Sequence, residues 1–391
     1  MRSTLSSDRT PVVAAAFRTP IGRVNGSLSA IEPASLAAPL IRKILAETGL
    51  AATAVDDVIL GNAANSAGNL ARLAALEAGL PVAVPGMTVD RQCGSGLEAI
   101  ALAARLIEAG AGRFYLAGGT ESSSRAHLRF RPAQTPDGEP EPVRRARMAP
   151  DSVGDPDMGI AAENVAAHAG ISRARQDAFA LESHRRAVAA QKAGLFDGEI
   201  VPIDTPAGRV LSDECPRENT SLEKLAALKP VFRPDGTVTA GNACPVNDGA
   251  AVVLVTSLAA AQELGLTVLL EIVDSAVCGV DPNLLGLGPV PAMQKLAARN
   301  PGLDAGKIPF VEFNEAFASQ VLASLDALGI DPATVNRDGG ALALGHPYGA
   351  SGAILVTRLF AQMRAAEAGS EALAMMGIGG GMGITTLLKK F

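Results

Sequence analysis

The fold of this chain is decided by the stretch Thr88-Val89-Asp90-Arg91-Gln92-Cys93-Gly94-Ser95-Gly96-Leu97-Glu98-Ala99-Ile100. It begins as a short extended run and turns at residues 93–96. Apolar residues then recur at the spacing of one helical face, at Leu97, Ile100, Ala101, Ala104 and Ile107. Gly110 supplies a stop signal for that helix. We therefore predict a sharp strand-to-helix turn that places Cys93 at or just before a helix N-terminus.

This position suggests a reactive thiol. The free N–H groups and the positive end of a helix dipole favour a thiolate, which is the nucleophilic form of cysteine. Gly94 and Gly96, which follow Cys93, permit a tight turn and leave room for a substrate. However, a single cysteine is most often a small buried apolar residue. The hypothesis that Cys93 is a nucleophile therefore depends on features elsewhere in the chain.

Composition limits the classes of protein that the chain can belong to. It has 391 residues, 48% of them apolar, so two or more domains or one duplicated domain are expected. The net charge of −6 gives no support for nucleic-acid binding. No apolar run reaches membrane-spanning length, and the first residues lack the apolar core of a signal peptide. The four cysteines lack metal-type spacing and suit reduced thiols, so we expect a cytoplasmic protein without a bound metal.

Short apolar runs alternate with helical patterns along the first third of the chain. This alternation predicts an α/β fold with a mostly parallel sheet covered on both faces. The composition of the chain changes after about residue 120. Residues 125–157 are rich in Arg and Pro. Within this stretch, the basic residues 144–147 favour a solvated loop, although they also suit phosphate. We interpret 120–248 as an inserted loop domain, between an N-terminal half (1–119 plus 249–270) and a C-terminal half (271–391).

The C-terminal half repeats the first. Val335-Asn336-Arg337 corresponds to Val89-Asp90-Arg91, and Ala350-Ser351-Gly352-Ala353 corresponds to Gly94-Ser95-Gly96-Leu97. An apolar helix and a strand that runs into glycines follow in both halves. Duplication predicts two similar α/β halves packed against each other, with a ligand site at their junction, near the carboxyl ends of strands.

Three C-terminal clusters add candidate catalytic groups. Asn314 follows an apolar strand, His346 lies in a loop held by proline and glycine, and residues 379–381 are three consecutive glycines. The glycines fit neither the Walker pattern nor G-x-G-x-x-G, so they do not indicate a nucleotide cofactor. Together the clusters supply the parts for acyl transfer through a thioester on Cys93. His346 would take the thiol proton, and backbone N–H groups at Cys93 and Gly379 would hold the oxyanion. A second oxyanion would lie between His346 and a water oriented by Asn314.

These residues resemble the thiolase family. The resemblance rests on the stretches Cys93-Gly94-Ser95-Gly96, Gly118-Gly119-Thr120-Glu121-Ser122, Asn314-Glu315-Ala316-Phe317, Gly345-His346-Pro347 and Gly379-Gly380-Gly381-Met382-Gly383, in the expected order. It implies a duplicated five-layered α-β-α-β-α fold and a homodimer or homotetramer. It also implies acyl-CoA substrates, with coenzyme A thioester as the substrate and no covalently bound cofactor. By resemblance, the coenzyme A positions are Arg217, Ser221, Phe232 and Cys244, and Met158 is a pocket-lining position.

The sequence also departs from the family pattern. Members that make or break a carbon–carbon bond usually have a second cysteine just before Ile-Gly-Gly-Gly, where this chain has Gly377. Three hypotheses remain open. The first is a thiolase-like acyl-CoA C-acyltransferase whose Claisen condensation or thiolysis is impaired or specialised. The second is a biosynthetic enzyme that uses a non-standard acceptor. The third is a non-catalytic homologue that binds acyl-CoA.

Overall fold

The computed structural model describes residues 6–65, 68–135, 137–143 and 145–391. Within these residues, ten strands form one sheet in the order β12-β13-β14-β11-β1-β10-β5-β3-β4, with β2 paired to β10. Their bounds are β1 (Pro11–Arg18), β2 (Gly22–Arg23), β3 (Asp57–Gly61), β4 (Gly86–Val89), β5 (Phe114–Ser122), β10 (Asn247–Ser257), β11 (Leu270–Gly279), β12 (Phe310–Phe313), β13 (Glu371–Ile378) and β14 (Met382–Lys390).

The sheet is mixed, so the expectation of a mostly parallel sheet is wrong. Only the pairs β3–β4, β3–β5 and β12–β13 are parallel among the described strands. Strands β13 and β14 are joined by the glycine turn, in which Gly380 and Gly381 have positive φ, and a hairpin requires antiparallel neighbours. Strands β1 and β10 are buried on both faces, so their apolar runs resemble those of parallel strands in the sequence.

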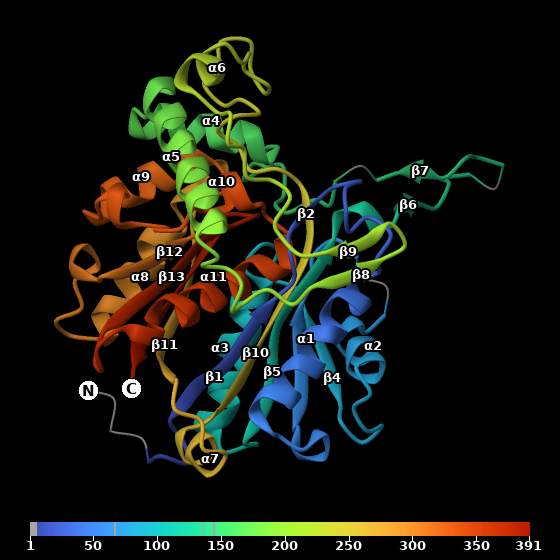
Figure 1. Cartoon of the computed structure of the whole chain (residues 1–391). Coiled ribbons are helices and arrows are strands. Elements are labelled where there is room, and N and C mark those ends of the chain that lie inside the picture. The colour runs from blue at the N-terminus through green and yellow to red at the C-terminus, as the bar shows by residue number, and fades with distance from the viewer. Residues whose placement is uncertain (1–5, 66–67, 136, 144) are drawn as a thin grey trace.

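The predicted duplication is confirmed by the strand order. From the middle of the sheet outward, the first half runs β1-β10-β5-β3-β4 and the second runs β11-β14-β13-β12. Val335 extends the second half by a parallel bridge to Val311 on β12, just as β4 pairs with β3. The two halves meet where β1 pairs with β11. Figure 1 shows the N-terminal half in blue and teal, with β10 in yellow, and the C-terminal half in orange and red.

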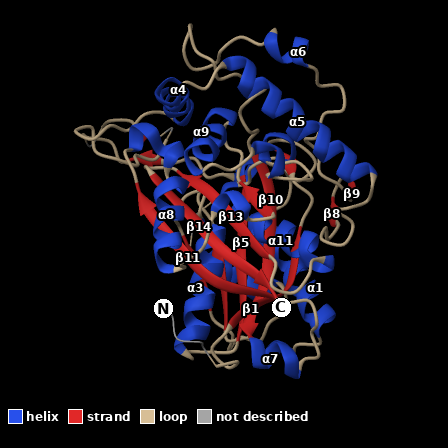
Figure 2. Ribbon diagram, turned by 90° about the vertical axis from the view of Figure 1, so that its left-hand side faces the viewer, coloured by secondary structure: helices blue, strands red, loops and turns tan. Residues whose placement is uncertain are grey.

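Helices complete the five layers of the fold (Figures 1 and 2). Helix α1 (Pro33–Thr48) and α2 (Leu70–Glu77) cover the outer face of the first half. Helix α8 (Pro289–Arg299) packs on β11 and β14, with α9 (Ala318–Leu328) beside it. Helices α3 (Ser95–Ala109) and α11 (Tyr348–Gln362) lie between the two halves.

The two central helices approach each other closely because of glycine. A Cβ atom on Gly96 would lie 2.7 Å from the carbonyl oxygen of Gly349. A Cβ atom on Gly352 would lie 2.4 Å from the backbone nitrogen of Leu97. Gly96 and Gly352 are matching positions of the internal repeat, so the duplicated motif is also the contact between the halves.

The segment between β5 and β10 covers one end of this sandwich, with its helices at the top of Figure 1 and its short strands at the right. It contains α4 (Met158–Ala169), α5 (Arg173–Lys192), α6 (Leu222–Ala226), the pair β6 (Phe130–Arg131) and β7 (Glu141–Pro142), and the pair β8 (Ile203–Thr205) and β9 (Gly208–Val210). The remaining helices are α7 (Leu258–Glu263), α10 (Ala341–Leu344) and the short 3-10 helices η1 (Ala52–Ala54), η2 (Ser123–Arg125), η3 (Pro282–Leu287), η4 (Ala305–Lys307), η5 (Pro332–Thr334) and η6 (Met363–Ala365). The boundaries of the three proposed domains stay a prediction.

Candidate active site

Cys93 lies in the predicted turn between a strand and a helix. Strand β4 ends at Val89, and α3 begins at Ser95 with Gly94 as its N-cap. The hydroxyl of Ser95 donates to the carbonyl of Gln92 at 2.6 Å, and Gln92 has a φ of 48°. A Cβ atom on Gly94 would lie 2.4 Å from Ile378. Glycine at 94 therefore lets the turn approach the loop that follows β13.

This turn does not produce a resting thiolate, so that part of the sequence interpretation is wrong. Burial raises the pKa of the Cys93 thiol to about 11. The backbone N–H groups of Gly379 and of Cys93 itself bond to the sulfur and lower the pKa, while the carboxylates of Glu121 and Asp90 raise it. Desolvation thus outweighs the N–H groups at the helix terminus. At neutral pH, Cys93 is a thiol with two N–H donors directed at it.

His346 is held as a neutral imidazole. Its backbone N–H donates to Oδ1 of Asn247 at 2.8 Å, and its Nδ1 lies 2.6 Å from the hydroxyl of Ser351. That hydroxyl donates to the carbonyl of Pro347 at 2.9 Å, so it accepts a hydrogen bond from Nδ1–H. Nε2 is then the unprotonated nitrogen and faces Nδ2 of Asn314 at 3.4 Å. Burial lowers the pKa of His346 to about 4, so the ring is uncharged and able to accept a proton.

Asn314 is held at the end of β12. Its backbone N–H donates to the carbonyl of Met375 on β13 at 2.9 Å. The next residue, Glu315, is buried and accepts hydrogen bonds from Ser183 on α5, from Asn336 and from the backbone N–H of Leu342. The carboxylate of Glu315 therefore connects the loop of Asn314 to the inserted segment, through Ser183, and to the repeated motif of the C-terminal half, through Asn336.

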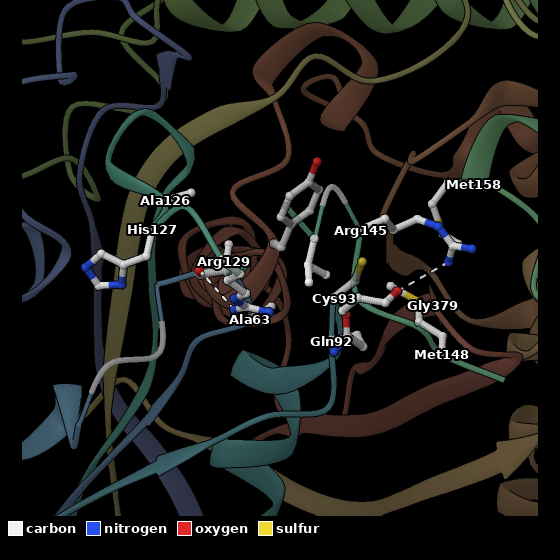
Figure 3. A pocket seen from close by; sticks show the side chains of 14 residues that line it. Ala63, Gln92, Cys93, Ala126, His127, Arg129, Arg145, Met148, Met158 and Gly379 are labelled. Atoms are coloured by element: carbon white, nitrogen blue, oxygen red, sulfur yellow. Dashed lines mark hydrogen bonds between the residues drawn. The ribbon is translucent and has the colours of Figure 1, made fainter. Parts of the chain in front are cut away.

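Cys93 opens onto a pocket of about 370 Å³ at the junction of the halves (Figure 3). Gln92, Gly379 and Met148 lie close to the thiol, with Met158 and Arg145 beside them and Arg129 and His127 across the pocket. Met158 therefore lines the pocket, where the resemblance placed it. The role of Tyr348 was missed, although it follows His346 and Pro347 in the motif. Its ring lies 5.1 Å from that of His346, and it also lines this pocket.

Arg145 was expected in a solvated loop but faces this pocket. Its guanidinium bonds to Asp155 at 2.8 Å and pairs with Asp157 at 3.0 Å. These two acidic neighbours give the only signal in the sequence for a fixed arginine here. Arg144 lies outside the described residues, and Arg147 is exposed and pairs with Asp151.

A second pocket of about 360 Å³ lies under the inserted segment. It brings together three predicted coenzyme A residues, Arg217, Phe232 and Cys244, with His184. The backbone N–H of Cys244 donates to the carbonyl of Ala316 at 2.9 Å, so this pocket adjoins the loop that carries Asn314.

Ser221 does not line either pocket. It is the N-cap of α6, and its hydroxyl accepts from the backbone N–H of Lys224 at 3.3 Å. Burial raises the pKa of Cys244, and an ionised Cys93 would raise it further, which places the thiols of Cys93 and Cys244 near each other.

Gly377 lies on β13 opposite Gly383, two residues before the N–H that bonds to Cys93. A Cβ atom at this position would lie 3.2 Å from Nε2 of Gln320 and 3.6 Å from the carbonyl oxygen of Gly286. Gln320 is buried, and neither polar atom of its amide has a partner among the described residues. The space beside Gly377 is thus bordered by an amide that a longer side chain would contact.

Two protein-family profiles match this chain. The profile "Thiolase, N-terminal domain" matches residues 11–259, and "Thiolase, C-terminal domain" matches residues 266–390. The chain belongs to the thiolase family. Family members use coenzyme A thioesters, and the predicted enzyme class, an acyltransferase of the thiolase type, is confirmed.

Several relatives of this thiolase are known by name. YhfS of Bacillus subtilis (strain 168), described as a candidate acetyl-CoA C-acetyltransferase, is 46% identical over 380 residues, which is 97% of this chain and 98% of that protein. An acetyl-CoA acetyltransferase of Pseudomonas aeruginosa is 45% identical over 395 residues, which is 97% of this chain and 99% of that one. The crystal structure of the Bacillus anthracis acetyl-CoA acetyltransferase superimposes with a TM-score of 0.89 at 37% identity, covering 98% of this thiolase and 99% of that chain.

Among the described residues, no group of three or more His, Cys, Asp and Glu side chains is placed to hold a metal ion. None of the helices described for this chain is both long enough and apolar enough to cross a membrane.

Proposed function

We propose that this thiolase is an acyl-CoA C-acyltransferase that forms an acyl thioester on Cys93. The observation that carries the proposal is that Cys93 and Gly379 line the main pocket together, with the backbone N–H groups of both residues close enough to the thiol to lower its pKa. A carbonyl attacked by this sulfur would have its oxygen near the same donors. Backbone donors fixed in this way stabilise the oxyanion of acyl transfer.

The first half-reaction uses groups that are present. Sγ of Cys93 attacks the thioester carbonyl and its proton passes to Nε2 of His346, while the carbonyl π electrons move to oxygen. When the tetrahedral intermediate collapses, the bond to the sulfur of coenzyme A breaks, and that thiolate takes the proton back from His346. Because the thiol and the imidazole are both neutral at rest, proton transfer accompanies attack and no ion pair is formed beforehand.

Coenzyme A is proposed to lie in the second pocket. Arg217 supplies a positive charge for phosphate, and Phe232 supplies an apolar face for pantetheine or adenine. Phe232 also packs edge-on against Phe317, at 6.3 Å between ring centres, which connects this pocket to the loop of Asn314. Ser221 caps a helix, so the structure gives less support to its proposed role in coenzyme A binding.

Gly377 affects the second half-reaction, in which the acyl group is transferred to its acceptor. Condensation requires a group that removes a proton from the α-carbon of the second acyl-CoA, and glycine has no side chain for this. The neighbouring Gln320 amide does not act as a base at neutral pH. We therefore propose a specialised or slow condensation and thiolysis, and the use of another acceptor by the acyl-enzyme is the alternative that this observation favours.

Intact-mass measurement after mixing with acetyl-CoA and longer acyl-CoAs tests the proposal. We expect one acyl group to be added to the unaltered protein and none to the Cys93→Ser variant. The chain length that reacts fastest would identify the donor. Binding of acyl-CoA without any covalent addition would reject the enzyme and support a non-catalytic acyl-CoA-binding homologue.

We also propose a cytoplasmic homodimer or homotetramer. The outermost strand β4 is only partly buried, and large apolar residues are exposed close to it along the chain, at Leu73, Leu76 and Val82. An unpaired sheet edge beside exposed apolar side chains is typical of a surface that pairs with another chain. Sedimentation of the protein at several concentrations would distinguish a dimer or tetramer from a monomer.

A further inference from the structure

The main pocket is larger than an acetyl group requires. Cys93 opens onto about 370 Å³, whereas an apolar cavity of about 150 Å³ is already enough to hold benzene. Alanine, valine and methionine side chains form most of its wall, among them Val143, Met148 and Met158. An acyl chain of several carbons on Cys93 therefore fits in this pocket, and its far end would contact the opposite wall.

The charged side chains that line this pocket are basic. Arg129, Arg145 and His127 line it, and within the described residues no aspartate or glutamate does. In Figure 3, Arg129 and His127 lie on one side of Cys93, and Arg145 lies on the other. The charge of Arg145 is already balanced by Asp155 at 2.8 Å and Asp157 at 3.0 Å. The charge of Arg129 remains to be accounted for.

Arg129 has no acidic partner in the part of the chain that the structure describes. Its guanidinium donates to the carbonyl of Ala64 at 3.3 Å and forms no ion pair. The other arginines described between residues 125 and 147 all lie within 4.0 Å of a carboxylate: Arg125 pairs with Glu32, Arg131 with Glu141, Arg145 with Asp155, and Arg147 with Asp151. A guanidinium presents a planar fork of N–H donors that matches a carboxylate. Arg129 can therefore bind an anionic group that enters the pocket.

These observations indicate what kind of acyl group suits the pocket. We propose that the acyl group accepted by Cys93 ends in a second carboxylate, which Arg129 binds, so that the donor is the coenzyme A thioester of a dicarboxylic acid. This inference rests on the proposed acyl thioester on Cys93 and names its substrate class. The second carboxylate takes no part in bond making. Acylation is the step described above, with the thiolate of coenzyme A as the leaving group.

The phosphates of coenzyme A are the other anions of such a donor. The proposed function assigns them to Arg217, which lines the second pocket and not the main one. Arg129 lines the main pocket together with Cys93, so it is placed for the acyl end of the donor. Its side chain is exposed, so water and salt partly screen its charge. We therefore expect a moderate and salt-dependent preference for the charged acyl group.

The test compares acyl-CoAs that differ only at the far end of the chain. Glutaryl-, adipyl- and suberyl-CoA are each paired with pentanoyl-, hexanoyl- or octanoyl-CoA, which has a methyl group in place of the carboxylate. The rate of Cys93 acylation is followed by rapid quenching and intact-mass measurement. For the chain length that reaches Arg129, we expect the charged member to react about tenfold faster at low salt, the scale of one charge-assisted hydrogen bond. The difference should shrink at about 1 M salt, where the Debye length falls to about 3 Å. Equal rates within all three pairs, or faster reaction of the neutral members, would overturn the inference.

The variant Arg129→Gln removes the charge and keeps a hydrogen-bonding side chain of similar length. It should bring the two members of the preferred pair to similar rates. Arg131→Gln is the matched control, because Arg131 lies on β6, two residues further along the chain, and does not line the pocket. It should keep the preference. A preference that persists in Arg129→Gln would assign the recognition of the carboxylate to another residue and reject the role of Arg129.

A binding measurement separates this inference from the proposed function. The Cys93→Ala variant cannot form a thioester, and calorimetry gives its dissociation constants for adipyl-CoA and hexanoyl-CoA. We expect the same preference for adipyl-CoA, and its loss when Arg129→Gln is added. If no acyl-CoA loads the unaltered protein while this preference is present, the proposed function is wrong and the carboxylate site at Arg129 stands. If Cys93 is loaded without any preference, the proposed function stands and the carboxylate site is rejected.

Discussion

The hydroxyl of Ser351 lies 2.6 Å from Nδ1 of His346 and decides which nitrogen of the ring is free. Because Ser351 donates its own hydrogen to the carbonyl of Pro347, Nδ1 must carry the ring proton. Nε2 then has its lone pair on the side of Asn314. Ser351 belongs to the repeat of the Cys93 turn, where Ser95 instead bonds within its own turn. The duplicated serine thus holds the nucleophile turn in one half and the proposed base in the other.

This relationship gives a prediction for His346. His346→Ala should slow acylation of Cys93 by about 10²–10⁴-fold, the usual cost of losing a general base. Ser351→Ala should slow it less, because the base remains but its tautomer is no longer fixed. Stopped-flow acylation with acetyl-CoA measures both rates, and thermal unfolding serves as the control. A lower melting temperature with near-normal acylation would assign His346 a structural role.

Cys93 should be the only covalent nucleophile, although its pKa is high. Burial raises the pKa of Cys93 and Cys215 to about 11, and it raises that of Cys244 as well. In the described part of the chain, two backbone N–H groups lower the pKa of Cys93, whereas one does so for Cys244 and none for Cys215. We expect acyl-CoA to label Cys93 alone at neutral pH, as read by peptide mass spectrometry. Cys278 is the internal comparison, because it is partly exposed but lies on β11. Acylation of Cys278 with Cys93 left free would refute the assignment.

Local sequence was sufficient for the parts of the site that depend on turn geometry. The turn at Cys93 follows from Gly94 and Gly96 and from the apolar spacing of the following helix. The duplication was also visible, because Asn336 and Gly352 repeat in order. The resting charge state was not predictable, since desolvation of Cys93 depends on contacts from Gly379 and from other distant segments.

Strand direction and the coenzyme A residues show a second limit of prediction from sequence. A strand buried on both faces has the same apolar run in parallel and antiparallel sheets, so β1 and β10 were not distinguishable from parallel strands. Arg217 and Phe232 share a pocket because the inserted segment folds back over the core. Ser221 lies in the same segment, but its hydroxyl is engaged in capping α6. A resemblance places residues along the chain, whereas local hydrogen bonds determine what each side chain contacts.

Arg217 should contribute to coenzyme A binding through its charge. Its side chain lines the second pocket, and it is exposed to solvent. Arg217→Ala should raise the Michaelis constant for acyl-CoA about tenfold, the scale of one lost charged hydrogen bond to phosphate. The same variant should behave normally with a short pantetheine thioester, which lacks the nucleotide. Lys224→Ala is a suitable control, since Lys224 lies on α6 and donates to the carbonyl of Asn219. Equal effects of Arg217→Ala on both substrates would reject the assignment.

Gly377 should separate the two half-reactions of thiolase chemistry. Acylation requires a nucleophile, a base and an oxyanion site, and we propose that Cys93, His346 and Gly379 supply them. Carbon–carbon bond formation also requires a group at the α-carbon, and its absence costs about 10²–10⁴-fold, or roughly 3–5 kcal/mol of barrier. We therefore expect fast acylation of Cys93 with weak condensation and weak thiolysis of acetoacetyl-CoA.

The variant Gly377→Cys tests this directly, because the strand can accept a side chain there. The nearest atom to an added Cβ is Nε2 of Gln320 at 3.2 Å, so this amide would have to move by only a few tenths of an ångström. The new thiol should raise condensation while the acylation rate stays nearly unchanged. Gly377→Ala adds the Cβ without the thiol and should leave condensation weak, which separates chemistry from packing. Robust thiolase turnover by the unaltered protein would contradict the prediction, because it would require another base near the thioester. The buried thiol of Cys244, which lies near Cys93, would then be the first residue to substitute.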